Sequence, residues 1–376
     1  MILTIIIFIF TLLVLIVSHE FGHFIVAKKF GVKVLEFGFG LPPKIWGKKI
    51  GETLVSINFL PIGGFVRLLG EDEVDKKILK EKDSFAAKNV WKRIGIVTAG
   101  VVMNLLLAVF IFWIVLASSG FKQTIPLLTP YHFIGVNQTE KTEIVVGETS
   151  AGSPAQKAGI EAGDRIVKFN DIGLVDSQQL IDLTKAQYGA KFNLTLLNQE
   201  NKSRQIEVTP RTNPPEGEGP LGIALGDMVI AELNYQTLEQ KIASGFTHSY
   251  NLAFYSFNIL GKLIATSYQT RNLEPVAGTI AGPVGITNLT ASILKTQSPL
   301  IPYLNFVALL SLNLAILNIL PFPALDGGRI FFLLIEAITR KRVKPEIERW
   351  IHSAGMAILI ALIVLVTFSD ISKLLH

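Results

Sequence analysis

The sequence His19-Glu20-Phe21-Gly22-His23 follows an uninterrupted apolar stretch from Ile2 to Ser18. On a helix, histidines at positions i and i+4 lie on one face, where both imidazoles can bind one zinc ion. The glutamate between them can then act as a general base toward a zinc-bound water. Ionisable side chains are costly inside a membrane, so a cluster of them at the end of an apolar span indicates a functional site. The motif therefore predicts hydrolysis at membrane depth.

A second group of polar residues closes another apolar stretch, in the sequence Asn318-Ile-Leu-Pro-Phe-Pro-Ala-Leu-Asp326-Gly-Gly. The two prolines break a helix, and irregular backbone in a bilayer is tolerated where it is buried in protein or lines a wet cavity. Two histidines, one carboxylate and a water form a catalytic zinc site, so Asp326 is the candidate third ligand. The alternative is that Asp326 only caps the next helix, expected from Gly328 to Ile338.

Composition supports a membrane protein and limits the chemistry. Hydrophobic residues make up 49% of the chain and charged residues only 17%, whereas soluble domains carry about 25% charged residues. The chain has no cysteine, which excludes thiolate zinc sites, disulfides and cysteine nucleophiles. A metal must then be held by His, Asp or Glu. The net charge of +5 is explained by membrane loops, so we expect no nucleic-acid partner.

Four stretches are long and apolar enough to cross a bilayer, which takes about 20 residues. They are residues 2–27, 94–118, 297–325 and 350–369. The connecting segments 27–93 and 326–352 are rich in Lys and Arg, so the positive-inside rule places them in the cytoplasm. Both termini and the segment 119–296 are then expected on the opposite, outer side of the membrane. On this topology the spans that end in His19–His23 and Asp326 bring these residues to the same depth, near the cytoplasmic side.

The connecting segments carry patterns of their own. Residues 50–70 predict two strands around a turn near Gly63-Gly64. The edge of this hairpin could bind an extended peptide, or the hairpin could only pack against the spans. The segment 125–230 alternates strand-like stretches with a helical one, and residues 233–296 include an amphipathic helix expected at the outer membrane interface. The strand-like stretches are Glu143–Glu148, Arg165–Asn170, Phe192–Leu197 and Gln205–Thr209, and the helical stretch is Ser177–Thr184.

The two polar motifs together resemble the site-2 protease family of intramembrane zinc metalloproteases, in particular its regulator of sigma-E protease branch, over nearly the whole chain. The resemblance implies that His19, His23 and Asp326 bind zinc and that Glu20 is the catalytic base. It also implies substrate or oxyanion binding by Asn318 and Asn104. The family's Gly-Pro-x-x-Asn element reads Gly100-Val-Val-Met-Asn104 here, without the proline. Asn313 lies five residues before Asn318 and is a weaker candidate.

The run from Ser153-Pro154-Ala155 to Gly163-Asp164-Arg165-Ile166 resembles a PDZ domain, and it occurs once. PDZ domains bind extended peptides along a sheet edge, which Gly219–Leu225 could supply. The domain could instead act as a size filter for substrates, or be purely structural. The expected fold is thus an α-helical polytopic membrane protein with four transmembrane helices, a membrane-associated β-hairpin and an inserted PDZ-like α+β domain. Its two membrane halves are residues 1–118 and 297–376.

The function expected from the resemblance is that of a zinc-dependent intramembrane endopeptidase. It would cleave transmembrane segments of single-span proteins, such as anti-sigma factors already cut by a site-1 protease, or remnant signal peptides. A zinc transporter would need further acidic or histidine sites, and neither the second span nor residues 353–369 of the fourth have any. A membrane-anchored PDZ scaffold would not need Glu20. The histidines outside the motif are expected to be ordinary surface or interfacial residues: His132, His248, His352 and His376.

Overall fold

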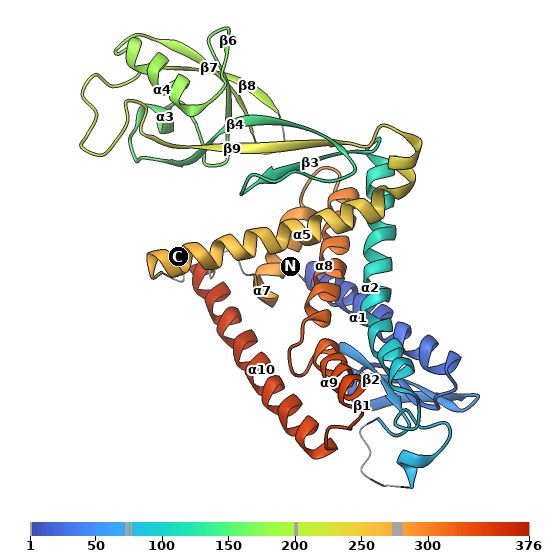
Figure 1. Cartoon of the computed structure of the whole chain (residues 1–376). Coiled ribbons are helices and arrows are strands. Elements are labelled where there is room, and N and C mark those ends of the chain that lie inside the picture. Colours follow the sequence, from blue (N-terminus) through green and yellow to red (C-terminus); the bar gives the residue numbers. More distant parts are fainter. Residues whose placement is uncertain (1, 72–74, 76, 199–201, 273–280, 376) are drawn as a thin grey trace. The chain divides into compact units, whose positions relative to one another are not determined.

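The computed structural model describes residues 2–71, 75, 77–198, 202–272 and 281–375 (Figure 1). The chain divides into two compact units. One unit comprises Met1–Ser118 and Ile242–His376, and we call it the membrane unit. The other, Ser119–Lys241, is inserted between these two segments and is called the inserted domain.

The membrane unit contains the four apolar helices that the sequence predicts. They are α1 (Ile2–Lys29), α2 (Val90–Ser118), α8 (Leu300–Ile319) and α10 (Pro345–Leu375). Among the described residues, these are the helices that are long and apolar enough to cross a membrane. The buried share of their most apolar windows is 44% in α2, 22% in α1 and α8, and only 6% in α10. Such helices suit a hydrocarbon solvent, so the chain is a polytopic α-helical membrane protein.

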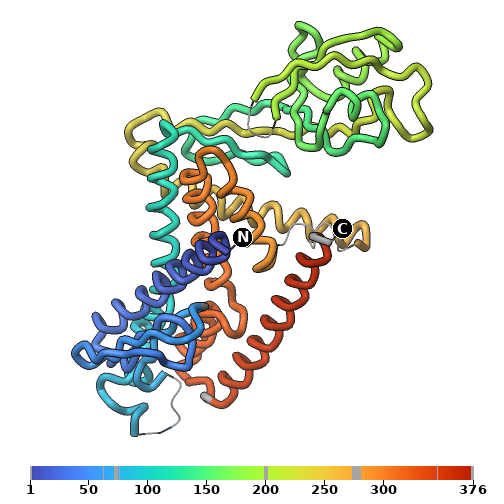
Figure 2. Tube along the Cα trace, turned by 180° about the vertical axis from the view of Figure 1, so that it is seen from behind, coloured from blue at the N-terminus to red at the C-terminus, as the bar shows by residue number. Residues whose placement is uncertain are grey.

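Helix α2 packs against three other helices of the membrane unit, α1, α8 and α9 (Asp326–Thr339), and its trace runs beside that of α8 in Figure 2. Its crossing with α1 is close at Gly22, where a side chain would collide with the Ala99 carbonyl. Small residues allow this approach, which is how membrane helices gain packing energy without a hydrophobic effect. On the other side of α2, the Ser311 hydroxyl of α8 donates a 2.8 Å hydrogen bond to the Asn104 carbonyl.

The β-hairpin is longer than predicted, and its turn is elsewhere. Strands β1 (Val34–Ile50) and β2 (Thr53–Leu68) join at Gly51, whose φ is +61°, while Gly63-Gly64 lies inside β2. The strands bend back on themselves, so Phe37 pairs with both Val55 and Val66. From the sequence alone, glycines in this region would be expected to interrupt a strand. Gly38 instead makes room for the Phe65 ring, which a side chain there would strike.

The described part of the membrane unit also contains α5 (Leu238–Thr270), α7 (Pro283–Leu294) and α9. A short 3-10 helix, η1, covers Ile78–Lys80. The third span was predicted to reach residue 325, but α8 ends at Ile319 because Pro321 and Pro323 remove the amide donors that would continue it. Helix α5 is amphipathic as expected. Several of its polar and small residues are buried, such as Ser244, Gly245 and Asn251, whereas large apolar residues such as Phe246 and Phe254 are exposed.

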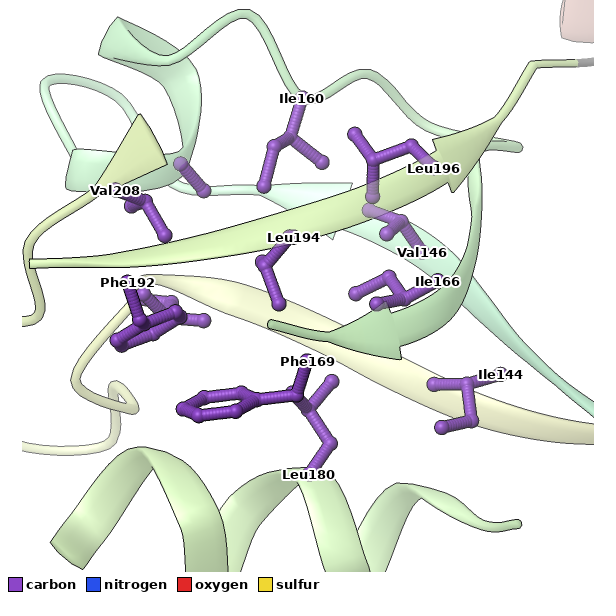
Figure 3. Close-up of a cluster of buried hydrophobic side chains, with 12 residues drawn as sticks. Ile144, Val146, Ile160, Ile166, Phe169, Leu180, Phe192, Leu194, Leu196 and Val208 are labelled. Carbon is purple, nitrogen blue, oxygen red and sulfur yellow. The ribbon is translucent and has the colours of Figure 1, made fainter. Parts of the chain in front are cut away.

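The inserted domain is a mixed α/β fold. Its sheet has the order β3-β9-β4-β5-β7-β8, with β6 paired to β5. The strands are β3 (Lys122–Leu127), β4 (Asn137–Thr149), β5 (Arg165–Phe169), β6 (Ile172–Gly173), β7 (Phe192–Leu197), β8 (Ser203–Val208) and β9 (Ile223–Asn234). Two helices, α3 (Pro154–Lys157) and α4 (Ser177–Ala186), accompany the sheet. In Figure 3, Leu180 of α4 lies against Phe169 in a core of aliphatic and aromatic side chains.

All four strand-like stretches predicted here are strands, and the predicted helical stretch is α4. Of the Gly219–Leu225 segment, which was predicted to supply a sheet edge, residues 223–225 belong to strand β9. Residues 229–234 of β9 lie between β3 and β4, while residues 223–228 pair with β4 alone. The carboxylate of Asp227 in this free half accepts hydrogen bonds from the Ser177 amide and hydroxyl, at 2.8 and 2.9 Å.

Candidate metal centre

Three side chains from distant parts of the sequence converge in the membrane unit. Asp326 Oδ2 lies 3.0 Å from His19 Nε2 and 3.3 Å from His23 Nε2. The two Nε2 atoms are 3.1 Å apart. These three residues form the group of His, Asp and Glu side chains that could hold a metal ion among the described residues. The structure therefore brings together the two halves of the predicted zinc site.

The spacing of the three donor atoms fits a zinc ion. Tetrahedral zinc with bonds of about 2.0–2.1 Å holds its ligand atoms about 3.3 Å from one another. The three observed separations, 3.0, 3.1 and 3.3 Å, are close to this value. Asp326 Oδ2 is buried and makes no well-directed hydrogen bond, although both imidazoles are near it. A buried carboxylate oxygen of this kind calls for a cation, so the donor set fits zinc.

The orientation of His23 is fixed from behind the site. Its Nδ1–H donates a 2.8 Å hydrogen bond to the Ile96 carbonyl of α2. With the proton on Nδ1, Nε2 keeps its lone pair and faces Asp326 and His19. Metal-binding histidines are commonly held by such a bond from the other ring nitrogen. His19 Nδ1 is buried without a hydrogen-bond partner among the described residues.

Helix α2 is shaped to accept the two imidazole rings. A side chain at Gly100 would collide with both His19 and His23, so the two rings pack against α2 only because this residue is a glycine. This glycine is the first residue of the Gly100-Val-Val-Met-Asn104 element. Its role is steric, and it does not require the proline that the family pattern has at the next position.

Asp326 reaches the histidines from an irregular loop between α8 and α9. The N-cap of α9 is Leu325, and no side chain caps this helix end. Asp326 lies in the first turn with its carboxylate toward the imidazoles, so the predicted alternative of a capping role is wrong. Gly327 and Gly328 let the loop fold tightly, since side chains there would strike the carbonyls of Leu320 and Phe322.

Glu20 lies at the same depth and interacts electrostatically with His19, His23 and Asp326. It is half-buried, and on its other side is strand β2: a side chain added at Gly64 would come within 3.5 Å of Glu20 Cγ. The Glu20 side chain thus has both the metal-site residues and the hairpin as neighbours. A peptide bound against this part of β2 would pass beside it.

The structure places the three asparagines differently. Asn104 is 1% exposed, and its side-chain amide has no hydrogen-bond partner among the described residues. It lies one helical turn after Gly100 on α2. Asn318 is half-buried in the last turn of α8, and Asn313 is exposed. No hydrogen bond joins the side chain of Asn104 or Asn318 to the three metal-site residues in the described part of the chain.

Two histidines outside the motif are not ordinary surface residues, contrary to the sequence prediction. His248 is 1% exposed and lies edge-on to Phe112, with ring centroids 5.0 Å apart. His352 Nδ1 accepts a 2.9 Å hydrogen bond from the Ala324 amide, in the loop that carries Asp326. Neither contact has a local sequence signal, because each joins residues from distant helices. His132 is exposed as expected, and His376 lies outside the described residues.

Comparison with known proteins places this site in a family. The model of peptidase family M50 matches residues 7–362, so the chain belongs to this site-2 protease family. A Clostridium perfringens protein with a provisional zinc-metalloprotease name is 37% identical, with 95% of each chain covered. The regulator of sigma-W protease RasP of Bacillus subtilis is 27% identical, with 99% of each covered. The zinc metalloprotease RasP of Geobacillus kaustophilus is 28% identical over 96% of this chain and 95% of that protein.

The chain is thus a zinc metalloprotease of the membrane. A solved PDZ domain of an SdrC-like protein from Listeria monocytogenes aligns with 26% of this chain and 93% of its own, at 20% identity and a TM-score of 0.20. This likeness is too weak to assign the inserted domain, whose PDZ character stays a prediction.

Proposed function

We propose that the chain is an intramembrane endopeptidase in which His19, His23 and Asp326 bind zinc and Glu20 is the general base. The observation that carries this proposal is the convergence of three donor atoms within hydrogen-bonding distance of one another, from spans about 300 residues apart in sequence. When bound, zinc would supply a polarised water and a Lewis acid for the scissile carbonyl.

The protein's own residues would handle the proton and the substrate. Glu20 would take a proton from the attacking water and deliver it to the leaving amine. The scissile segment must be extended, because a helix hides its peptide carbonyls in its own hydrogen bonds. Strand β2 near Gly64 lies beside Glu20 and could pair with such a segment by strand addition.

The two asparagines are proposed to bind the substrate backbone or the developing oxyanion. Asn104 supports this role best, because its buried amide offers an unused donor and acceptor. Asn318 is supported by its position in the last turn before the Asp326 loop. Both would act on substrate and not on the metal.

The proposed substrates are single-span membrane proteins already shortened by another protease, such as anti-sigma factors, or remnant signal peptides. The inserted domain, as a PDZ-like domain over residues 125–230, would bind an extended peptide or exclude bulky ectodomains. The free half of β9, residues 223–228, is the strand edge available for a peptide. We propose a bacterial inner membrane with both termini and this domain outside and the metal site near the cytoplasmic side.

Replacing Glu20 tests the proposal directly. The variant Glu20→Gln keeps the size of the side chain and removes the base, so we expect full zinc content and at least a ~100-fold loss in kcat on a model transmembrane substrate. The measurement pairs zinc per protein with cleavage in detergent micelles. The variant Asp182→Asn, on α4 of the inserted domain, is a matched carboxylate-to-amide control. Retained zinc together with normal cleavage by Glu20→Gln would contradict the proposed mechanism.

A further inference from the structure

The loop that carries Asp326 has an unfavourable backbone. Ala324 adopts a φ of +80°, in the left-handed region that non-glycine residues rarely visit. The loop has few bonds of its own: the Phe322 amide bonds to the Leu320 carbonyl and the Leu325 amide to the Phe322 carbonyl, at 2.6 and 3.2 Å. Strained backbone of this kind persists only where the surrounding structure holds it. The question is which contact holds this loop.

His352 of α10 provides that contact. Its Nδ1 accepts the Ala324 amide hydrogen at 2.9 Å, at the strained residue itself. The bond needs a neutral ring with its proton on Nε2. In a membrane an unpaired backbone amide is costly, so this acceptor stabilises the loop conformation. The ring is mostly covered, and Phe332 of α9 lies against it with ring centroids 5.7 Å apart.

Gly355 allows α10 to come close enough for this bond. It follows His352 by three residues and therefore lies on the same face of the helix. A side chain at Gly355 would collide with Pro323, both with its ring and with its backbone. His352 and Gly355 thus contact two consecutive residues, Pro323 and Ala324. Together they form a support for the loop two residues before Asp326.

We propose that His352, with Gly355, is a positioning residue of the metal site: helix α10 supplies no ligand, but it sets the place of the ligand Asp326. This inference rests on the proposed role of Asp326 as a zinc ligand. Metal sites need their ligands within about 0.5 Å of the productive geometry, and loss of outer partners commonly weakens metal binding 10–100-fold. A loop released from α10 would relax away from the φ of +80° at Ala324 and carry Asp326 with it.

The test measures zinc affinity of the full chain in detergent by competition with a chelator, beside kcat and KM. In His352→Leu the acceptor is lost, and we expect zinc affinity to fall by about 10-fold or more and kcat to fall with little change in KM. In His352→Asn the side-chain oxygen can replace Nδ1, so most of the affinity and rate should return. A merely structural role for His352 would show no such rescue.

Two controls separate the possible causes. His132→Leu removes an exposed histidine of the inserted domain and should change nothing. Asp370→Asn loosens the other end of α10, where the Asp370 carboxylate accepts a 2.7 Å hydrogen bond from the Gly285 amide. It should leave zinc affinity unchanged. If His352→Leu cannot be purified, Gly355→Ala tests the same support, because its methyl group pushes on Pro323.

The inference is overturned if His352→Leu, or Gly355→Ala in its place, binds zinc with wild-type affinity, or if His352→Asn is as weak as His352→Leu. Asp326→Asn distinguishes this failure from a failure of the proposed function. Weak zinc binding by Asp326→Asn with normal binding by His352→Leu would reject the positioning role alone. Normal zinc binding by Asp326→Asn would reject the ligand assignment on which the inference depends.

Discussion

The membrane unit and the inserted domain bury opposite kinds of side chain. The inserted domain has a core of residues such as Ile166, Phe169 and Leu194, each no more than 2% exposed. The membrane unit exposes large apolar residues on α1, α5 and α10 and buries His19, Asn104, His248 and Asn251. The first arrangement suits water and the second suits hydrocarbon. One chain is therefore held together by two different sets of forces.

The difference shows where stability and activity should be sensitive. In the inserted domain, the removal of apolar surface from water is the main favourable term. In the membrane unit that term is absent between helices, so close packing at glycines and buried polar contacts must replace it. The metal site lies in the second setting, among residues that a soluble core would exclude. Mutations in the membrane unit should therefore affect zinc binding and activity, whereas mutations in the inserted domain should affect the stability of that domain.

The largest effect is expected at Gly100, where the membrane unit has no room for a side chain. In Gly100→Ala the new methyl group displaces the rings of His19 and His23, and a shift of about 1 Å at reacting groups costs ~100-fold in rate. Cleavage of a model transmembrane substrate should fall by at least that factor, and zinc content should fall with it. Gly261→Ala is the matched control, since Gly261 of α5 faces open space. Normal cleavage by Gly100→Ala would show that the rings are not seated there.

The next effect is expected in the core of the inserted domain. Phe169→Ala removes a ring that stacks on Phe192 with centroids 4.3 Å apart, and such truncations cost about 3–5 kcal/mol. The domain should become protease-sensitive and exchange its amide hydrogens faster, while zinc content stays at the wild-type level. Ile172→Ala, at a half-exposed position, should have little effect. Loss of zinc in Phe169→Ala would mean that the two units are energetically coupled.

The smallest effect concerns His248, a buried polar residue of α5. Burial lowers the pKa of its imidazole from 6.5 to about 4, because the charged form is poorly solvated there. Between these two values the unfolded chain binds a proton at His248 and the folded chain does not. The contribution of neutral His248 to the free energy of unfolding is therefore complete above pH 6.5 and is lost as the pH falls toward 4. The free energy of unfolding should drop by up to about 3 kcal/mol over that window.

The measurement compares unfolding midpoints of the wild type and His248→Asn between pH 4 and pH 7 in the same detergent. All other ionisable groups are the same in both proteins, so the difference in slope isolates His248. The wild type should lose stability faster on acidification. Parallel curves would show that His248 stays accessible to protons in the folded chain.

The sequence predicted the parts of this molecule that depend on local pattern. The spacing of His19 and His23 on one helix face and the apolar lengths of four spans need no tertiary information. The pairing of Asp326 with the histidines followed from the predicted topology. That topology puts both motifs at the same depth in the membrane, where they can meet. Strands of the inserted domain followed from alternation of apolar and polar residues.

Features that depend on close packing were not predictable in this way. The hairpin begins at Val34, and its glycines serve as contacts for aromatic rings instead of as breaks. His352 looked like an interfacial residue, because nothing near it in sequence reveals that Ala324 needs an acceptor. Gly100 and Gly355 carry no side chain, and their roles appear only when the partner helix or loop is in place.

The central claim is that Asp326 and the two histidines bind one metal ion, and X-ray absorption of Asp326→Cys at the zinc edge tests it most directly. The chain has no cysteine, so any zinc–thiolate distance must come from this position. We predict one sulfur ligand at about 2.3 Å together with nitrogen ligands at about 2.0–2.1 Å. Zinc bound through nitrogen and oxygen alone, with no sulfur in its shell, would contradict the account.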